Sequence, residues 1–164
     1  MTINIKAVKR EEKLILRNLL ELYQHDMSEF NGADVNEHGE YGYNYLDQYW
    51  TEPSRFPFLI KISDELAGFA LIREISSGED KYFSMAEFFI LRKFRHCGLG
   101  RNVASQLFER FKGEWRVAQE VENHPAQEFW HKVISSFTKG NFELIEEKDC
   151  DGPVIKFTVD KREN

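Results

Sequence analysis

The chain has 164 residues, a length that suits one domain with one sizeable hydrophobic core. Apolar residues make up 41% and charged residues 30%, which excludes an intrinsically disordered chain and a membrane-embedded one. The formal net charge of -6 argues against nucleic acid as the main partner, because binding along a phosphate backbone needs a basic surface.

Targeting, membrane and metal-binding signals are not expected in this chain. The stretch from Met1 to Arg10 lacks the apolar core of a signal peptide, and no stretch approaches the roughly 20 apolar residues of a membrane span. The two cysteines, Cys97 and Cys150, are isolated, and the five histidines show no metal-ligand spacing. These observations predict a cytoplasmic location, with neither a membrane nor a metal as partner.

Apolar residues follow strand and helix periods in turn along the chain. They alternate with polar residues over 3–8, which favours a strand, and leucines recur near helical spacing over 11–29. Dense phenylalanines predict that strand 82–91 is buried on both faces. This order predicts a mixed α/β layer architecture around one sheet. The expected elements are strand 3–8, helix 11–29, a short helix at 43–49, strands 58–62, 65–74 and 82–91, helix 98–112, strand 115–119, helix 123–137, and strands 142–147 and 154–159.

Strand 82–91 leads into a glycine-containing loop that opens a helix. Such a loop leaves backbone N–H groups unpaired at the helix N-terminus, and its glycines let a phosphate approach the backbone closely. The loop predicts a site for a phosphate-bearing ligand, with a plain turn as the alternative. It lacks the Lys-Ser or Lys-Thr of a Walker loop and the third glycine of a dinucleotide-binding fingerprint. Positive charge gathers here without an intervening acid, on Arg92, Lys93, Arg95 and Arg101.

The sequence Arg95-His96-Cys97-Gly98-Leu99-Gly100, after a strand and before a helix, resembles motif A of the GNAT acyltransferase superfamily. The later Asn123-x-x-Ala126 is similar to a second segment of that family, and the order of elements matches its fold along nearly the whole chain. The resemblance implies a single domain over 1–164, of the α/β (mixed α+β) class. Its central sheet would be mostly antiparallel, with about seven strands and helices on both faces.

The resemblance also implies acetyl-CoA as co-substrate. In the family, the loop amides bind the CoA pyrophosphate, and the pantetheine arm pairs with the backbone at the end of strand 82–91. The amide of Ile90 would polarise the thioester carbonyl, as an oxyanion donor. Asn123 would contact the arm, with helix capping as an alternative or additional role. The implied cofactor-binding residues are Phe89, Ile90, Leu91, Arg95, His96, Cys97, Gly98, Leu99, Gly100, Arg101, Asn123, Phe129 and Trp130.

The implied reaction is direct attack of an amine on acetyl-CoA, without an acyl-enzyme. A lysine-like amine has a pKa of about 10.4, so a base or a water chain must remove a proton before attack. Glu87 is the candidate base. Strand alternation puts it on the opposite face from Ile90, and its apolar neighbours are expected to raise its pKa by desolvation. A structural ion pair with a nearby arginine is the alternative.

The sequence departs from the family at Trp130. A tyrosine that protonates the departing thiolate often stands at this position, and an indole has no such proton to give. Tyr82, His131 or water could replace it, or the thiolate could leave unaided. This departure keeps open a different class of function, a non-catalytic acyl-CoA-binding sensor or interaction module. A domain that binds nucleotides or phosphometabolites is a third alternative.

The family places its acceptor partly between the first two helices, which here corresponds to residues 26–52. This segment has seven acidic residues, four tyrosines and a tryptophan, but no Lys or Arg. Carboxylates and aromatic rings favour a cation, so a polyamine, an aminoglycoside or a lysine side chain is expected as acceptor, whether small molecule or peptide. A solvated acidic loop is the alternative, and a homodimer is left open. The candidate acceptor residues are Asp26, Glu29, Tyr41 and Tyr43.

Overall fold

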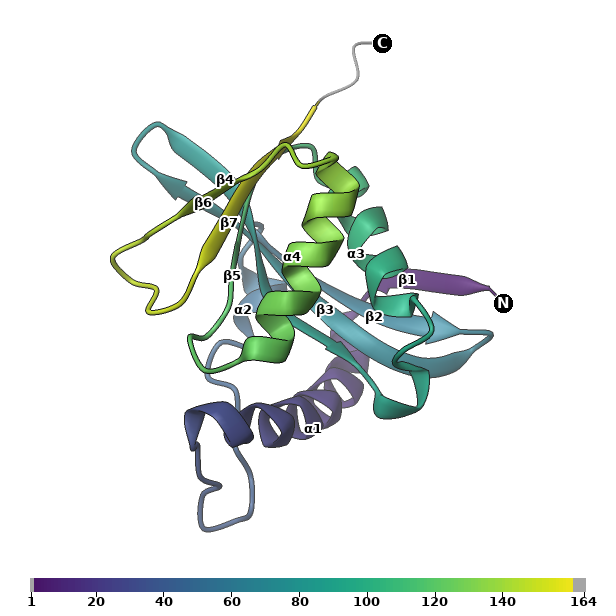
Figure 1. Ribbon diagram of the computed structural model, residues 1–164. Helices are drawn as coiled ribbons and strands as arrows, with labels where there is room; N and C mark the ends of the chain where they lie inside the picture. The colour runs from purple at the N-terminus through teal and green to yellow at the C-terminus, as the bar shows by residue number, and fades with distance from the viewer. Residues whose placement is uncertain (1, 161–164) are drawn as a thin grey trace. The chain divides into compact units, whose positions relative to one another are not determined.

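The computed structural model describes residues 2–160 (Figure 1). Within this range, seven strands have the order β1-β2-β3-β4-β5-β7-β6 in one sheet. β4 and β5 run parallel, whereas β1 with β2, β5 with β7, and β6 with β7 are antiparallel. The predicted mixed fold with a mostly antiparallel sheet of seven strands is therefore confirmed.

Every predicted helix and strand is present, and most bounds differ from the prediction by one to three residues. The elements are β1 (Ile3–Ala7), a 3-10 turn η1 (Arg10–Glu12), α1 (Lys13–Asn31), α2 (Gln48–Thr51), β2 (Arg55–Ile62), β3 (Glu65–Ser77), β4 (Asp80–Ile90), a 3-10 turn η2 (Arg92–Phe94), α3 (Leu99–Arg110), β5 (Gly113–Ala118), α4 (His124–Thr138), β6 (Glu143–Ile145) and β7 (Val154–Val159).

The position of the short second helix corrects the prediction. A helix was expected over 43–49, but α2 begins only at Gln48. The residues before it form successive turns with i to i+3 hydrogen bonds, such as Leu46 N to Tyr43 O at 3.2 Å. The buried side chain of Leu46 packs in a hydrophobic cluster, so tertiary packing decides this local conformation.

The chain folds as two compact units, which are described one at a time. The first comprises the chain up to Ile72 together with Ala86–Phe94, and the second comprises Arg73–Met85 together with the chain from Arg95 onward. The boundary crosses β3 and β4, so each of these strands contributes to both units. The single domain over 1–164 stays a prediction.

The core of the first unit forms between α1, the turns before α2, and strands β2 to β4. Leu16, Leu19 and Leu20 face this core from α1, whereas Leu14 and Leu22 on the same helix are exposed. Three aromatic rings meet at mutual centroid distances of 5.6 to 5.7 Å, those of Tyr23, Phe69 and Phe89. The further buried members of this cluster are Val8, Leu46, Tyr49, Leu59 and Leu71.

The core of the second unit is aromatic. The fully buried rings of Phe108 and Trp115 meet edge to face at 4.9 Å, and Phe157 from β7 lies 4.9 Å from Phe108. The Trp115 indole N–H donates to the carbonyl of Phe111 at 2.8 Å, so burial leaves no unpaired polar atom on this ring. Edge-to-face pairs add to the burial of apolar area and hold α3 against β5 and β7.

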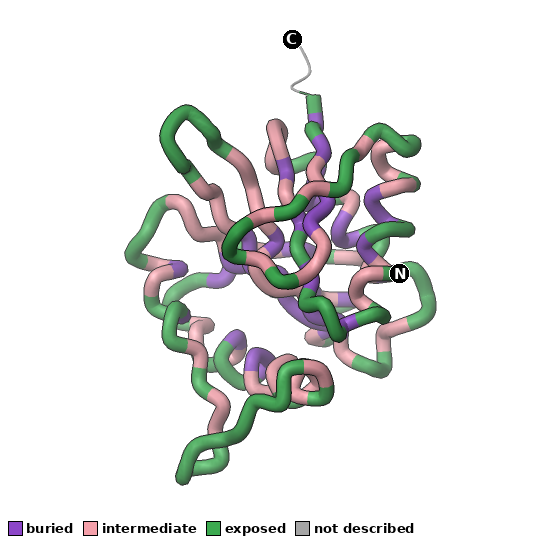
Figure 2. Tube along the Cα trace, turned by 60° about the vertical axis from the view of Figure 1, so that its left-hand side comes forward, coloured by how far each residue is buried: buried purple, intermediate pink, exposed green. Residues whose placement is uncertain are grey.

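The burial of β4 differs from the prediction. Only Met85, Phe89 and Ile90 of this strand are buried, and the phenylalanines at 83 and 88 are half-buried. The polar side chains of Ser84 and Glu87 interrupt the apolar run and need polar surroundings. Figure 2 shows the buried positions recurring along strands and helices, while the turns between them are exposed. None of the helices in 2–160 has the length and hydropathy that a membrane-spanning segment requires.

Candidate functional site

In the second unit, the loop before α3 has a backbone that suits anion binding. Gly98 stands at the N-cap of α3 with a φ of 82°, and His96 also has a positive φ, of 62°. A β-carbon at Gly98 would meet nothing within 4 Å, so conformation rather than crowding favours glycine there. No side chain caps this helix end. The first-turn amides, which no helical carbonyl can reach, therefore lie where helices bind anions.

The positive charge around this loop is smaller than the sequence suggests. In the first unit, Arg92 donates to Asp26 at 2.8 Å and Lys93 to Glu65 at 3.1 Å. In the second unit, Arg101 donates to the neutral hydroxyl of Ser136 at 2.5 Å, which leaves its charge uncompensated by that contact. Two of the four cations thus have acidic partners that lie far from them in the sequence.

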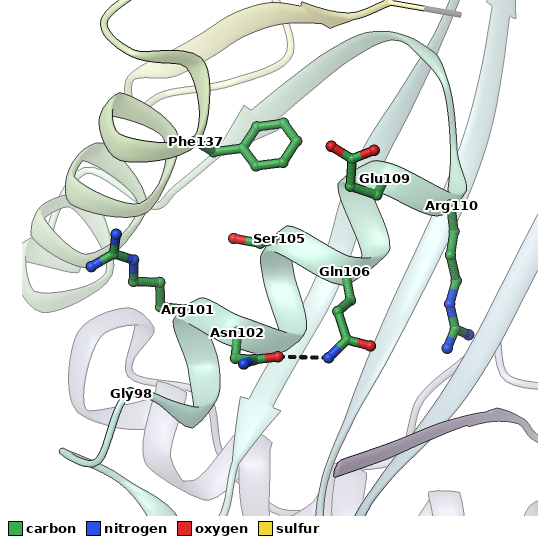
Figure 3. Close-up of a pocket in the computed structure, with 8 residues that line it drawn as sticks. All are labelled: Gly98, Arg101, Asn102, Ser105, Gln106, Glu109, Arg110 and Phe137. Carbon is green, nitrogen blue, oxygen red and sulfur yellow. Dashed lines mark hydrogen bonds between the residues drawn. The ribbon is translucent and has the colours of Figure 1, made fainter. Parts of the chain in front are cut away.

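A groove of about 840 Å³ runs along α3 from the loop. Figure 3 shows Asn102, Ser105 and Gln106 along the helix between Gly98 at one end and Glu109 at the other. Two arginines also line the groove, and its single acid forms an ion pair with Lys112. The excess of positive charge along the groove suits an anionic ligand. Its remaining lining residues are Arg101, Arg110 and Phe137.

The second family segment lies at the start of α4. Asn123 is buried, and its side-chain oxygen accepts from the amide of Ala126 at 3.1 Å, so the capping role is confirmed. Trp130 is buried as well, with its ring 6.3 Å from Phe108 and 4.9 Å from the half-buried Phe129. Trp130 therefore belongs to the aromatic core of this unit. Contacts of all three predicted residues with a cofactor stay predictions.

The end of β4 lies in the first unit, where β3 approaches it unusually closely. A β-carbon on Gly68 would lie 1.9 Å from the carbonyl oxygen of Phe89, which leaves room only for a hydrogen atom. The Leu91 amide donates to the carbonyl of Ala67 at 2.8 Å. β3 thus sets the backbone position of the residues around Ile90, which the sequence analysis assigned to the cofactor arm and the oxyanion.

Glu87 and Tyr43, two predicted site residues, meet in the first unit. The Tyr43 hydroxyl donates to Glu87 Oε1 at 3.5 Å. Burial, and then the charge of Glu87, raises the pKa of Tyr43 well above its ordinary value. Tyr49 is buried nearby, and its hydroxyl has no hydrogen-bond partner among the described residues. Arg55 lies over the Tyr49 ring at 5.4 Å and pairs with Glu52 at 2.8 Å.

The other predicted acceptor residues have varied surroundings. Asp26 is the partner of Arg92, and its side chain is mostly buried. Glu29 is exposed at the end of α1. The Tyr41 hydroxyl lies 3.2 Å from Nδ1 of His25, and its backbone amide donates to Glu21. Of the four candidates, Tyr43 has a hydrogen bond to the predicted base.

Three residues considered for catalysis or reactivity lie in the second unit. The Tyr82 ring lies 4.0 Å from the Arg116 guanidinium, and burial raises the pKa of its hydroxyl. His131 is exposed on α4, with its ring 5.4 Å from that of Phe142. Cys97 is exposed in the loop and takes part in no disulfide. These contacts do not single out one of the three residues as the proton donor for the leaving thiolate.

Sequence analysis missed two features of these sites. The first is Tyr49, which was counted only as one of several tyrosines in an acidic segment. The second is the groove along α3, whose residues Ser105, Gln106 and Arg110 carry no motif. The positions 102, 105, 106 and 109 share one face of a helix, so helical spacing was the available signal for the groove. No local signal connects Tyr49 with β4.

Comparison with known proteins gives a family and several similar folds. Residues 17–134 match the model of the acetyltransferase (GNAT) family. An acetyltransferase from Thermus thermophilus superposes with a TM-score of 0.72 at 15% identity, over 97% of this chain and 98% of that one. The PaiA N-acetyltransferase from Thermoplasma acidophilum, in complex with coenzyme A, has a TM-score of 0.65 at 13% identity, over 97% and 100% of the two chains.

A third similar structure is the spermidine N-acetyltransferase from Vibrio cholerae, in complex with CoA and spermine. Its TM-score is 0.64 at 13% identity, over 95% of both chains. At such identities these structures are evidence for the fold. No curated protein sequence matches this chain.

Proposed function

Because the chain belongs to the GNAT acetyltransferase family, whose members transfer an acetyl group from acetyl-CoA, we propose that it acetylates an amine by direct attack on the thioester. The observation that carries the proposal is the uncapped N-terminus of α3, with Gly98 in the left-handed region at the place of the family's glycine motif. The first-turn amides of α3, which no helical carbonyl can reach, and the open approach at Gly98 suit a pyrophosphate.

The amides of residues 95–101 would hold the pyrophosphate, and Arg101 and Arg110 in the groove offer charge to a further phosphate of CoA. The backbone of Phe89 and Ile90 would pair with the pantetheine arm, and Asn123 would contact it in addition to capping α4. The predicted pairing at Leu91 is not proposed, because its amide already donates to Ala67 and its carbonyl accepts from the amide of Phe94 at 2.9 Å. The Ile90 amide would donate to the carbonyl oxygen as negative charge develops there.

In the proposed reaction, the amine nitrogen attacks the thioester carbon and the C–S bond breaks. Glu87 accepts the amine proton, so a neutral nucleophile is available near neutral pH. The thiolate can leave without an acid on Trp130, because a thiol with a pKa of about 8.5 is a tolerable leaving group near neutrality. Water would then protonate it.

The acceptor is proposed to be a cationic amine. The support comes from the Glu87 carboxylate, the exposed Glu29 and the rings of Tyr41 and Tyr43, which together suit a cation. The Arg92 ion pair makes Asp26 a weaker candidate than the sequence indicated. The similar fold of an enzyme bound to spermine agrees with a polyamine, although it carries no argument beyond the fold.

The experiment is release of free thiol from acetyl-CoA with spermine, kanamycin, a lysine-containing peptide and a neutral amine. We expect turnover with at least one cationic amine and less with the neutral one. Turnover restricted to the neutral amine would contradict the cationic acceptor. Tight acetyl-CoA binding without turnover for any amine would instead support the second candidate, an acyl-CoA-binding sensor, which Trp130 in place of tyrosine favours.

The glycine at the N-cap of α3 offers a separate test of CoA binding. In Gly98→Ala, the left-handed φ costs about 1 kcal/mol of stability, and the loop relaxes away from the amide geometry. Loss of one hydrogen bond to a charged group, worth about 1.5 to 3 kcal/mol, should weaken CoA binding by roughly 10- to 100-fold in calorimetry.

The matched control is Gly78→Ala in the turn between β3 and β4. Gly78 has a φ of 63°, and a β-carbon there also meets nothing within 4 Å. We expect the same loss of stability with unchanged CoA affinity. Equal affinity of both variants for CoA would show that the Gly98 loop does not hold the cofactor.

A further inference from the structure

Four side chains from separate parts of the first unit form one cluster, which we call the Tyr43 cluster: Tyr43, Tyr49, Arg55 and Glu87. They come from the turns before α2, from α2, from β2 and from β4. The hydrogen bond from Tyr43 to Glu87 joins residues 44 positions apart in the sequence. The cluster therefore links the predicted acceptor segment to the proposed catalytic carboxylate.

Tyr43 is suited to act as a constant hydrogen-bond donor. Burial and the neighbouring carboxylate raise the pKa of its hydroxyl, so it keeps its proton throughout the working pH range. The backbone before it is anchored, because the Glu21 carboxylate accepts from the amides of Tyr41 at 2.8 Å and Gly42 at 2.9 Å. A donor on an anchored segment can hold the carboxylate of Glu87 in one orientation.

Tyr49 carries a hydroxyl that stability alone does not explain. The residue is 3% exposed, and its hydroxyl makes no hydrogen bond of normal geometry with any described residue. It nevertheless lies close enough to Tyr43 to affect the pKa of that residue. An unsatisfied buried hydroxyl destabilises a fold, whereas phenylalanine would fill the same space without that cost. Such groups are rare in native proteins, and a catalytic role is one of the explanations for them.

We propose that Tyr43 is a positioning residue for Glu87, and that the Tyr49 hydroxyl helps to hold the Tyr43 hydroxyl in place. The Tyr43 hydroxyl would orient the carboxylate toward the incoming amine and favour its charged, proton-accepting form. The Tyr49 hydroxyl, which lies close to that of Tyr43, would reach it through a small shift of the side chain. This inference rests on the proposed role of Glu87 as base.

The charges near the two tyrosines are those of Glu87 and Arg55. Both Tyr43 and Tyr49 are neutral hydroxyls that interact with the negative charge of Glu87 and with the positive charge of Arg55. Glu52 offsets part of that charge through its ion pair with Arg55. Because the hydroxyls do not titrate near neutrality, a change at Tyr43 alters donation to the carboxylate and no nearby charge.

The test is the variant Tyr43→Phe, with Tyr45→Phe as its control. Tyr45 is exposed, and its ring lies 6.1 Å from the Tyr43 ring, so loss of its hydroxyl keeps the ring packing. Carbon-13 NMR would follow the titration of glutamate carboxyls, with Glu87→Gln identifying the signal of Glu87. Without the hydrogen bond from Tyr43, the charged form of Glu87 is less favoured. The midpoint of the Glu87 titration should therefore rise by about half a pH unit or more in Tyr43→Phe, and should not change in Tyr45→Phe.

The kinetic readout is the pH profile of kcat/KM with spermine. A base acts when it is unprotonated, so kcat/KM falls at low pH as Glu87 takes up a proton. This acid limb of the profile should move to higher pH in Tyr43→Phe, and the rate should therefore fall more at pH 6 than at pH 8. A smaller shift is expected for Tyr49→Phe, whose folding stability should be unchanged or higher. Unshifted NMR and kinetic curves in a folded Tyr43→Phe protein would refute the positioning role.

The two proposals fail in different ways. An NMR shift in Tyr43→Phe supports the positioning contact even if spermine is not acetylated. If Glu87→Gln keeps the full rate and the full acid limb, the base assignment fails. If Glu87→Gln removes the acid limb while Tyr43→Phe leaves it and the NMR midpoint unmoved, only the positioning role fails.

Discussion

Replacement of Glu87 by glutamine is expected to lower kcat by about 10²- to 10⁴-fold at neutral pH, the usual contribution of a general base. Glutamine has nearly the same shape, and its amide oxygen can still accept from Tyr43, so the fold should persist. The uncharged side chain cannot take the amine proton. Steady-state kinetics with a saturating amine, alongside calorimetric binding of CoA, would separate a catalytic loss from a binding loss.

A control for Glu87→Gln is Glu65→Gln, which removes an exposed carboxylate of the same unit. Glu65 pairs only loosely with the exposed Lys93, so rate and stability should hardly change. The rate of Glu87→Gln should also recover as pH approaches the amine's own pKa, because a neutral amine needs no base. A fully active Glu87→Gln at neutral pH would favour the alternative, in which Glu87 is a structural ion-pair partner.

The second large effect is expected for Gly68→Ala. The added methyl group would lie 1.9 Å from the Phe89 carbonyl oxygen and 3.1 Å from the Ile90 α-carbon, so β3 and β4 must separate locally. Because the added methyl group meets backbone atoms, no change of side-chain rotamer can relieve the clash. The loss of folding stability should therefore exceed the roughly 1–3 kcal/mol typical of overpacking. Chemical denaturation would measure the stability. At a temperature where the variant is folded, acetyl transfer should be lost, because the Ile90 amide is displaced.

The control for Gly68→Ala is Leu71→Ala in the same strand. Leu71 is fully buried in the first-unit core, and its truncation should cost about 2–5 kcal/mol through a cavity. This variant loses stability without pushing the β4 backbone. A folded Leu71→Ala protein should therefore retain activity. Equal activity of the two variants when folded would argue against a catalytic role for the backbone at Ile90.

Turns, helix caps and the order of the helices and strands could be predicted from the sequence, because they depend on local interactions. The predicted strands 58–62 and 65–74 leave only Ser63 and Asp64 between them, and both residues have the positive φ of a tight turn, of 46° and 71°. Asn123 caps α4 as expected, and Gly98 occupies a left-handed N-cap as the glycine motif indicated. These features depend on one residue and its immediate neighbours. Hydrophobic periods extended the same reasoning to the order of strands and helices, and so to the fold class.

Long-range contacts determined what the sequence did not reveal. α2 begins five residues later than predicted, because Leu46 and Tyr49 pack into a core built from distant segments. Arg92 meets Asp26 across 66 positions, which lowers the free charge that the sequence indicated near the loop. The sequence by itself determined the loop at Gly98, since a helix N-terminus is local. Only the tertiary structure decided that Tyr43 meets Glu87, because no periodicity or motif connects a turn before α2 with the middle of β4.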